Sequence, residues 1–287
     1  MPLRQVTANG LRFSFHEEGR GPLVLLLHGF PDTPETWAEV QPALAALGYR
    51  TVAPFMRGYP PTEAPADGDY SLLRLGADVL ALIEALGETR AVVVGHDWGA
   101  FAAYAAANLD PSRLAKLVTL AIPHPGALRF SLASLVKSSH FITFQLRARA
   151  LKRLRRDDFA EVGAICRKWS PTWRPSDADL APVKRCLGSP GGLEGALGYY
   201  WSFRADLLGR RGAEARRVAR SKTSVPTLAF FGDLDGALDL AAIDRAPALF
   251  TGPYEAVRIP TAGHFMHREA PQLVLAKMRA FLGSEPG

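Results

Sequence analysis

The feature that most constrains this chain is the stretch Gly95-His96-Asp97-Trp98-Gly99, which lies between an expected strand and an expected helix. Flanking glycines permit a tight strand-to-helix turn that lifts the side chain of Asp97 clear of a sheet. The turn also places Asp97 at a helix N-terminus, where the dipole favours negative charge. Taken alone, the motif would suit an aspartate that only caps the helix. Together with the motifs below, it predicts a carboxylate nucleophile that attacks saturated carbon and leaves an alkyl ester.

Short strands and longer helices are expected to alternate along most of the chain. The dipeptide Asn9-Gly10, within residues 5–17, is a strong hairpin signal. Unbroken apolar runs predict strands, and periodic segments predict helices. The expected strands are 23–27, 50–54, 90–95, 116–122, 227–232 and 255–259, and the expected helices are 37–47, 72–86, 99–108 and 271–282. This alternation implies a parallel sheet with both faces covered.

The middle of the chain departs from this pattern because it is mostly helical in character and strongly basic. Residues 125–224 hold 20 Lys and Arg against 8 Asp and Glu, whereas the rest of the chain holds 14 against 20. We interpret 124–224 as a helical lid inserted into an α/β core of 1–123 and 225–287. The densest basic stretch, 147–156, is most simply a solvated helix face. The alternatives are steering of an anionic substrate and contact with an anionic membrane surface.

The loop after the first buried strand predicts part of an oxyanion site. His28-Gly29-Phe30-Pro31 follows strand 23–27. In enzymes whose nucleophile lies on such a turn, one oxyanion donor comes from this loop, and here it is the backbone N–H of Phe30. The second donor is the N–H of the residue after the nucleophile, Trp98. We interpret His28 as a structural histidine with no part in proton transfer.

A base and an acid are expected later in the chain, in the order nucleophile, acid, histidine. His264 follows the last expected strand and is the predicted base, while His267 is ranked behind it. The stretch Phe231-Gly232-Asp233-Leu234-Asp235 ends the preceding strand and offers two carboxylates. The spacing favours Asp235 as the acid that orients the imidazole, with Asp233 as the alternative.

Taken together, these motifs resemble those of the epoxide hydrolases of the α/β-hydrolase fold, which are close relatives of the haloalkane dehalogenases. The resemblance implies a mostly parallel eight-stranded sheet, flanked by helices and carrying an inserted helical lid. It also implies conversion of a small hydrophobic epoxide to a vicinal diol through an ester on Asp97. The motifs that carry it are His28-Gly29-Phe30-Pro31-Asp32, Arg57-Gly58-Tyr59, Gly95-His96-Asp97-Trp98-Gly99-Ala100, Pro123-His124-Pro125 and Ala262-Gly263-His264-Phe265.

The same resemblance implies two lid residues that donate hydrogen bonds to the opening epoxide oxygen. Tyr200 takes the place of the second lid tyrosine of the family, with Tyr199 close behind it. No tyrosine stands at the place of the first, where this chain has His140. A histidine can donate a hydrogen bond equally well, and packing within the lid is the simpler alternative for His140. Tyr199, Phe141 and Pro31 are expected to line the substrate pocket.

Other functions fit the sequence less well. A haloalkane or haloacid dehalogenase would share the Asp97 nucleophile but needs two N–H donors for the halide. Trp98 offers one of them, and Trp169, Trp173 or Trp201 in the lid would have to supply the second because Phe30 stands where an asparagine is common. A ligand-binding protein would not need His264, and a lipase or esterase would need a nucleophilic serine.

The cysteines, the apolar segments and the basic charge limit the cofactors and partners that we expect for this chain. Cys166 and Cys186 lie in no metal-binding or redox motif, and no metal or organic cofactor is expected. No stretch is long and apolar enough for a transmembrane segment, and no signal peptide is recognised. No nucleic-acid-binding motif accompanies the basic charge. We therefore expect a cytoplasmic monomer or homodimer that needs no nucleic acid partner.

Overall fold

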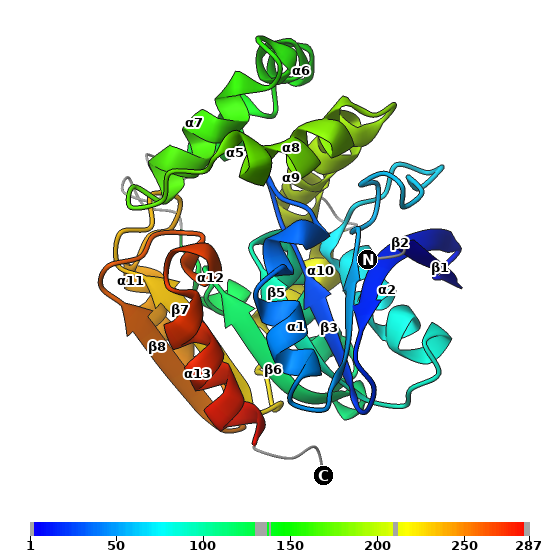
Figure 1. Cartoon of the computed structure of the whole chain (residues 1–287), viewed down its shortest axis with the longest axis vertical. Coiled ribbons are helices and arrows are strands. Elements are labelled where there is room, and N and C mark those ends of the chain that lie inside the picture. The colour runs from blue at the N-terminus through cyan, green and yellow to red at the C-terminus, as the bar shows by residue number, and fades with distance from the viewer. Residues whose placement is uncertain (1–2, 130–136, 138, 209–211, 284–287) are drawn as a thin grey trace.

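The computed structural model describes residues 3–129, 137, 139–208 and 212–283, and a single sheet forms its centre (Figure 1). The eight strands lie in the order β1-β2-β4-β3-β5-β6-β7-β8. They are β1 (Leu3–Ala8), β2 (Leu11–Glu18), β3 (Leu23–Leu27), β4 (Arg50–Pro54), β5 (Ala91–His96), β6 (Leu114–Leu120), β7 (Thr227–Gly232) and β8 (Tyr254–Ile259). The β1–β2 hairpin pairs antiparallel and β2 runs antiparallel to β4, whereas all other pairs are parallel. The predicted mostly parallel eight-stranded sheet is confirmed.

Helices cover both faces of the sheet because the side chains of its central strands alternate between two apolar layers. In β3, Leu23, Leu25 and Leu27 join a layer with α2 (Leu72–Ala85) and α3 (Trp98–Leu109). Val24 and Leu26 join the opposite layer with α1 (Val40–Ala45) and α13 (Pro271–Leu282). Such strands are buried on both sides, so they appear in the sequence as unbroken apolar runs.

Shorter helical segments complete the core around the sheet. They are η1 (Pro34–Trp37), α1 (Val40–Ala45), η2 (Pro111–Arg113), η3 (Pro125–Ala127), α11 (Ala241–Arg245), η5 (Ala246–Leu249), α12 (Met266–Glu269) and α13 (Pro271–Leu282). The expected helix 37–47 is instead the short helix η1 followed by α1. Because α1 begins at Val40, Pro42 falls in its first turn, where a missing N–H is tolerated, rather than in a helix interior.

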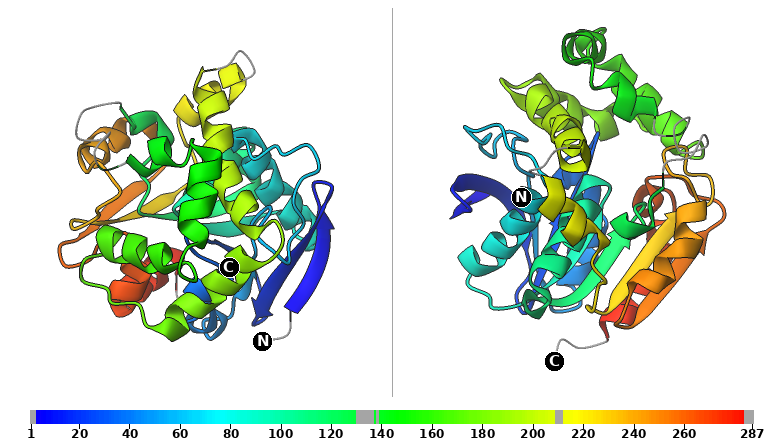
Figure 2. Two further views of the ribbon diagram at one scale, coloured as in Figure 1. Left: turned by 90° about the horizontal axis from the view of Figure 1, so that it is seen from above. Right: turned by 180° about the vertical axis from the view of Figure 1, so that it is seen from behind.

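Further helices separate β6 from β7 in the chain. They are α5 (Ser139–Thr143), α6 (Arg147–Arg155), α7 (Ala160–Trp169), α8 (Asp177–Gly188), α9 (Gly192–Leu208) and α10 (Ala213–Arg220). The helices α5 to α9 lie together at one end of the sheet (Figures 1 and 2). In contrast, α10 returns to the core and packs against α2 and α3.

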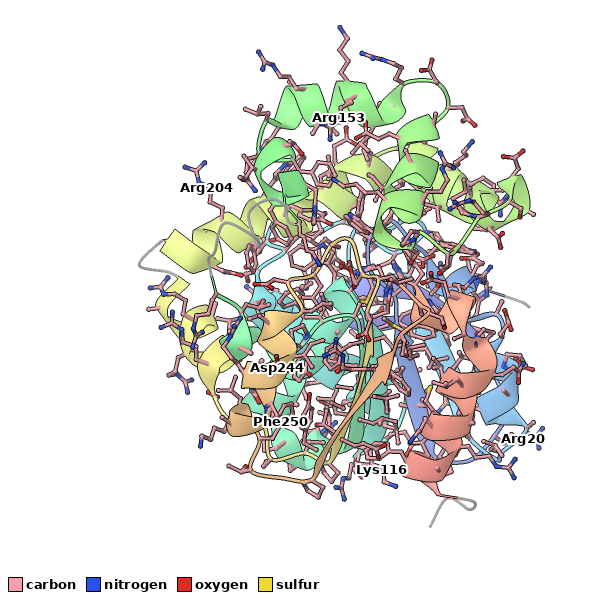
Figure 3. All side chains as sticks on the ribbon, turned by 90° about the vertical axis from the view of Figure 1, so that its left-hand side faces the viewer. Arg20, Lys116, Arg153, Arg204, Asp244 and Phe250 are labelled. Atoms are coloured by element: carbon pink, nitrogen blue, oxygen red, sulfur yellow. The ribbon has the colours of Figure 1, made fainter. Side chains whose placement is uncertain are left out.

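Much of the basic charge of this region points to solvent. In α6, Ala150 and Leu154 are buried, while most of its basic side chains are exposed. Two of its arginines form ion pairs, Arg153 with Glu161 and Arg155 with Glu194. On α9, Arg204 projects away from the body of the molecule (Figure 3). Among the helices within the described residues, none combines the length and apolar character needed to cross a membrane.

Candidate active site

Asp97 lies in a strained turn directly between β5 and α3. Its φ of +51° falls in the left-handed region, which is costly for a residue with a side chain. The neighbouring glycines are required by close backbone contacts. A Cβ on Gly95 would lie 2.3 Å from the carbonyl oxygen of Gly99, and one on Gly99 would lie 2.2 Å from that of Leu27. The glycines of the motif therefore permit the turn that carries the acidic side chain.

One oxygen of the Asp97 carboxylate is held by the loop that follows β3. The backbone N–H of Phe30 donates to Asp97 Oδ1 at 2.8 Å. A Cβ on Gly29 would lie 2.4 Å from this same oxygen, so glycine is needed for the loop to come so close. The backbone N–H of Trp98 begins α3, where N–H groups lack intrahelical acceptors. The loop and the turn thus bring together the two residues predicted for the oxyanion site.

His264 connects the other Asp97 oxygen to a second carboxylate. Its Nε2 lies 3.5 Å from Asp97 Oδ2, and its Nδ1 lies 2.9 Å from Asp235 Oδ2. The second oxygen of Asp235 accepts the N–H groups of Ala237 and Leu238 at 2.7 and 3.1 Å. Asp235 is thus locked in place with one oxygen directed at the imidazole, in the arrangement predicted for the acid.

The alternative acid, Asp233, is directed elsewhere. Its carboxylate pairs with Arg258 at 2.7 Å, and its side chain is 28% exposed. The side chain of Asp235, by contrast, is fully buried. Of the two carboxylates that the sequence left open, the one in contact with His264 is therefore Asp235.

The opposite charges of His264 and its two neighbouring carboxylates, Asp97 and Asp235, stabilise one another in the buried site. Burial by itself would lower the pKa of His264, but the carboxylates of Asp235 and Asp97 outweigh burial and raise this pKa to about 10. Burial also opposes ionisation of Asp97, yet His264, His96 and the N–H of Phe30 hold the pKa of Asp97 below its ordinary value. The resting site thus contains an ionised carboxylate beside an imidazole whose basicity depends on that negative charge.

Tyr200 and His140 approach this group from the helical side. The Tyr200 ring packs edge-on against Phe30 and Trp98, with centroids 5.4 and 5.0 Å apart, and it is 1% exposed. The ring of His140, on α5, lies 5.8 Å from that of Tyr200 and 4.7 Å from that of Trp169. Both predicted lid donors therefore border the same aromatic enclosure.

The protonation states of these two residues suit hydrogen-bond donation. Burial, with the nearby charge of Asp97, raises the pKa of Tyr200 well above its ordinary value, so the phenol keeps its proton. Burial lowers the pKa of His140 to about 4, so its imidazole is neutral and carries one N–H. Within the described part of the chain, its Nδ1 is buried and meets no hydrogen-bond partner.

The predicted pocket residues differ in where they point. The ring of Phe141 contacts Tyr200 and Trp98, with centroids 4.9 and 5.8 Å apart. Pro31 is buried directly after Phe30, the residue predicted to be an oxyanion donor. The hydroxyl of Tyr199, however, donates to the carbonyl of Arg57 at 2.8 Å, so this hydroxyl is engaged with the main chain of the core.

His28 supports the oxyanion loop. The backbone N–H of Met56 donates to His28 Nε2 at 3.0 Å. Burial lowers the pKa of His28 to about 4, which keeps the ring neutral and able to accept this bond. The geometry agrees with the structural role expected for this histidine.

Three other buried side chains lie beneath the base. Within the described part of the chain, the group that offers ligand atoms to a metal ion is Asp32, His96 and His267, whose candidate atoms lie within 4.8 Å of one another. His96 Nε2 donates to the carbonyl of His264 at 3.0 Å, and His267 Nε2 lies 2.6 Å from Thr36 Oγ1. Burial keeps both imidazoles neutral by lowering the pKa of each. We assign this group to structural support of the His264 loop.

Sequence reasoning missed two polar residues that contact the base loop. Ser170 Oγ accepts the backbone N–H of Phe265 at 2.8 Å and donates to Glu269 at 2.7 Å. Glu269 also accepts the N–H of Gly263 at 2.8 Å. Neither residue belongs to a periodic apolar pattern or to a recognised sequence motif. The only local signal is that Glu269 closely follows His264 and precedes Pro271.

Comparison with known proteins identifies the family. Residues 22–271 match the family described as alpha/beta hydrolase fold. Epoxide hydrolase A of Mycobacterium tuberculosis (strain ATCC 25618 / H37Rv) is 30% identical over an alignment of 321 positions, gaps included. The alignment covers 97% of this chain and 96% of that protein. The chain belongs to the epoxide hydrolase family. Epoxide hydrolase 3 of Xenopus tropicalis is 31% identical over 286 residues, which cover 96% of this chain and 75% of that protein.

A solved structure agrees with this membership. The crystal structure of epoxide hydrolase A from Mycobacterium thermoresistibile aligns with a TM-score of 0.82 and 28% identity, and the alignment covers 98% of each chain. The resemblance to epoxide hydrolases of the α/β-hydrolase fold is confirmed, and the chain is a hydrolase. The dehalogenase alternative gains no support from these epoxide hydrolase relatives.

The electrostatics predict that replacing Asp97 with Asn lowers the pKa of His264. The negative charge of Asp97 is one of two that raise this pKa to about 10, so its removal makes the imidazole easier to deprotonate. Titration of the histidine ring signals by NMR in wild-type and Asp97→Asn protein measures the change. An Asp233→Asn variant is the control and should titrate as wild type. An unchanged pKa in Asp97→Asn would contradict the proposed dependence.

The hydrogen bonds predict opposite outcomes for the two neighbouring carboxylates. Asp235→Asn should lower the turnover of an epoxide by a factor on the order of 10³–10⁴, because the amide cannot stabilise the imidazolium of His264. Asp233→Asn should stay within about twofold of wild type, because it loses only a partly exposed ion pair. Steady-state rates of diol release from both variants test this, and equal losses would refute the choice of Asp235.

Proposed function

We propose that this chain hydrolyses a small apolar epoxide to a vicinal diol through an ester on Asp97. The observation that carries the proposal is that the two oxygens of the Asp97 carboxylate have different partners. Its Oδ1 accepts the N–H of Phe30, while its Oδ2 lies toward His264. The aromatic rings of Phe30, Trp98 and Tyr200 favour an apolar substrate.

The first step forms the ester. Asp97 Oδ2 attacks one ring carbon, a new C–O bond forms, and the bond between that carbon and the epoxide oxygen breaks. The electron pair goes to the epoxide oxygen, which accepts hydrogen bonds from Tyr200 and His140 and takes the phenol proton of Tyr200 as the ring opens. Donation is worth most at the moment when charge develops on that oxygen, so both groups act on the transition state.

The second step hydrolyses the ester. Once Asp97 is esterified, its negative charge is gone, the pKa of His264 falls from its resting value, and the imidazolium releases a proton that restores the Tyr200 phenol. The imidazole then takes a proton from water, the hydroxide adds to the ester carbonyl, and the N–H groups of Phe30 and Trp98 stabilise the oxyanion. Collapse breaks the acyl C–O bond, and the diol leaves with a proton returned by His264. The new carboxylic acid of Asp97 then gives its proton to His264, which restores the resting site. Asp235 holds the imidazole throughout.

The helical region completes the site in this proposal. Residues 124–224 act as a lid over the core formed by 1–123 and 225–287. Closing the lid excludes water and strengthens the electrostatic interactions inside. The nucleophile, the base and the proton donors all come from side chains of this chain, so the proposed reaction is independent of a cofactor. A cytoplasmic location and a monomeric or homodimeric state remain predictions from the sequence.

Dehalogenation would need a second N–H donor for the halide beside Trp98. The indole N–H of Trp201 donates to the carbonyl of Phe144 at 2.8 Å and is already engaged. Trp169, whose ring packs against those of His140 and His264, keeps the place of such a donor. The preference for an epoxide therefore rests on the epoxide hydrolase relatives.

Trapping the ester tests the proposal directly. In His264→Gln protein the second step lacks its base, so incubation with styrene oxide should add the mass of the epoxide to Asp97. Peptide mass spectrometry locates the adduct. Asp97→Asn is the negative control, and 1-bromohexane tests the haloalkane alternative. An adduct from the bromide alone would favour dehalogenation over the proposed function. The absence of an adduct from a panel of aryl and alkyl epoxides would reject the proposed function.

The ring-opening donors are tested by removing each separately. Tyr200→Phe and His140→Phe should each slow ester formation by a factor of about 10²–10⁴, because each removes a donor to the developing alkoxide. Single-turnover measurement of adduct formation in the His264→Gln background gives this rate. Tyr254→Phe, a tyrosine that stacks on Phe250 outside the site, is the control. An unchanged rate in either test variant would remove that residue from the mechanism.

A further inference from the structure

A short segment that begins at the last residue of α7 holds the backbone of His264. We call Trp169–Thr172 the strap. The carbonyl of Trp169 accepts the N–H of His264 at 3.0 Å, and Ser170 Oγ accepts the N–H of Phe265 at 2.8 Å. The strap therefore binds two consecutive N–H groups of the base loop, although it lies far from that loop in the sequence.

Glu269 completes the attachment from the other side. Its Oε2 accepts the hydroxyl of Ser170 at 2.7 Å and the N–H of Gly263 at 2.8 Å. Its Oε1 accepts the hydroxyl of Thr172. The N–H groups of three successive residues, 263 to 265, are thereby fixed by the strap and by this one carboxylate.

The strap also contacts the loop that carries the acid. The carbonyl of Trp169, which binds His264, accepts the N–H of Gly236 at 3.1 Å as well. The fit is tight, because a Cβ on Gly236 would lie 2.2 Å from the carbonyl oxygen of Lys168. A Cβ on Gly263 would lie 2.6 Å from both the Cα of Ser170 and the oxygen of Trp169. One carbonyl thus joins the acid and base loops.

The hydroxyl of Ser170 links the N–H of Phe265 to the carboxylate of Glu269 at a buried position. Ser170 is completely buried, so water cannot replace its hydroxyl once it is removed. The N–H of Phe265 would then be left unpaired in the interior, and Glu269 would lose a donor. The loop that carries His264 would be free to shift relative to Asp97 Oδ2, which lies 3.5 Å from His264 Nε2.

We propose that Ser170 and Glu269 are positioning residues for His264, through which the helical lid sets the rate of the hydrolytic step. The inference rests on the proposed function, in which His264 acts as base only after the ester has formed. Loss of either residue therefore slows ester hydrolysis and leaves ester formation at Asp97 nearly unchanged. A residue with only a structural role would not separate the two steps.

The test follows both half-reactions in Ser170→Ala and Glu269→Ala protein. Each is mixed with excess styrene oxide and quenched, and the ester on Asp97 is measured by intact mass against time. We expect ester hydrolysis to slow by about tenfold or more, with ester formation within about twofold of wild type, so that the ester accumulates. Glu269→Gln keeps an acceptor oxygen for Gly263 and should restore part of the rate.

Ser202→Ala provides a matched control. Ser202 also lies in the helical region, on α9, and its Oγ accepts a core N–H, that of Tyr70, at 3.2 Å. It touches neither catalytic loop among the hydrogen bonds of the described residues. Its removal should leave both half-reactions unchanged. Equal slowing of both steps in Ser170→Ala, or unchanged rates for both steps, would overturn the positioning role.

A spectroscopic measurement separates this inference from the proposed function. The proton between His264 Nδ1 and Asp235 Oδ2, atoms 2.9 Å apart, should give a low-field NMR signal without any substrate. We expect it to shift upfield or broaden in Ser170→Ala and to stay unchanged in Ser202→Ala. If epoxides form no ester even on His264→Gln protein, the proposed function fails. The NMR signal then decides the positioning role alone, and an unchanged signal would refute it.

Discussion

The structure depends on keeping one carboxylate ionised in a largely water-free interior. The Asp97 residue is 8% exposed, and burial of an isolated anion is strongly unfavourable. The protein compensates with the N–H of Phe30, with the imidazole of His264 and with the start of α3. Each of these comes from a different loop at the carboxyl end of the sheet. The need to bring them together explains the glycines at 29, 95 and 99. A Cβ on Gly29 would collide with the Asp97 side chain, and one on Gly95 or Gly99 would collide with neighbouring backbone.

The same charge also links the two proposed chemical steps. While Asp97 is ionised, it raises the pKa of His264 and holds the imidazole beside it. When Asp97 becomes an ester, that support disappears and the imidazole becomes ready to deprotonate water. No separate switch is needed, because the product of the first step alters the electrostatics for the second.

The helical region contributes more than a cover. In the proposed mechanism Tyr200 and His140 supply the donors on the side of the substrate, and the strap supplies hydrogen bonds to the backbone of His264 and Phe265. The proposed lid would then act on catalysis through hydrogen bonds as well as through enclosure. The burial of Ser170 keeps water away from the hydrogen bond between its hydroxyl and the N–H of Phe265.

The sequence by itself determined the alternating core and the glycine turn that carries Asp97, and it singled out His264 as the expected base, because these inferences depend on local patterns. Apolar runs are visible where a strand is buried on both faces, and a glycine motif is visible where a turn must be tight. The break near Pro42 could have been anticipated from the missing N–H, whereas the exact start of α1 could not. Only the tertiary structure showed which of Asp233 and Asp235 contacts His264, since both follow the same strand. It alone revealed Ser170 and Glu269, because hydrogen bonds between segments about 95 residues apart leave no periodic signal in the chain.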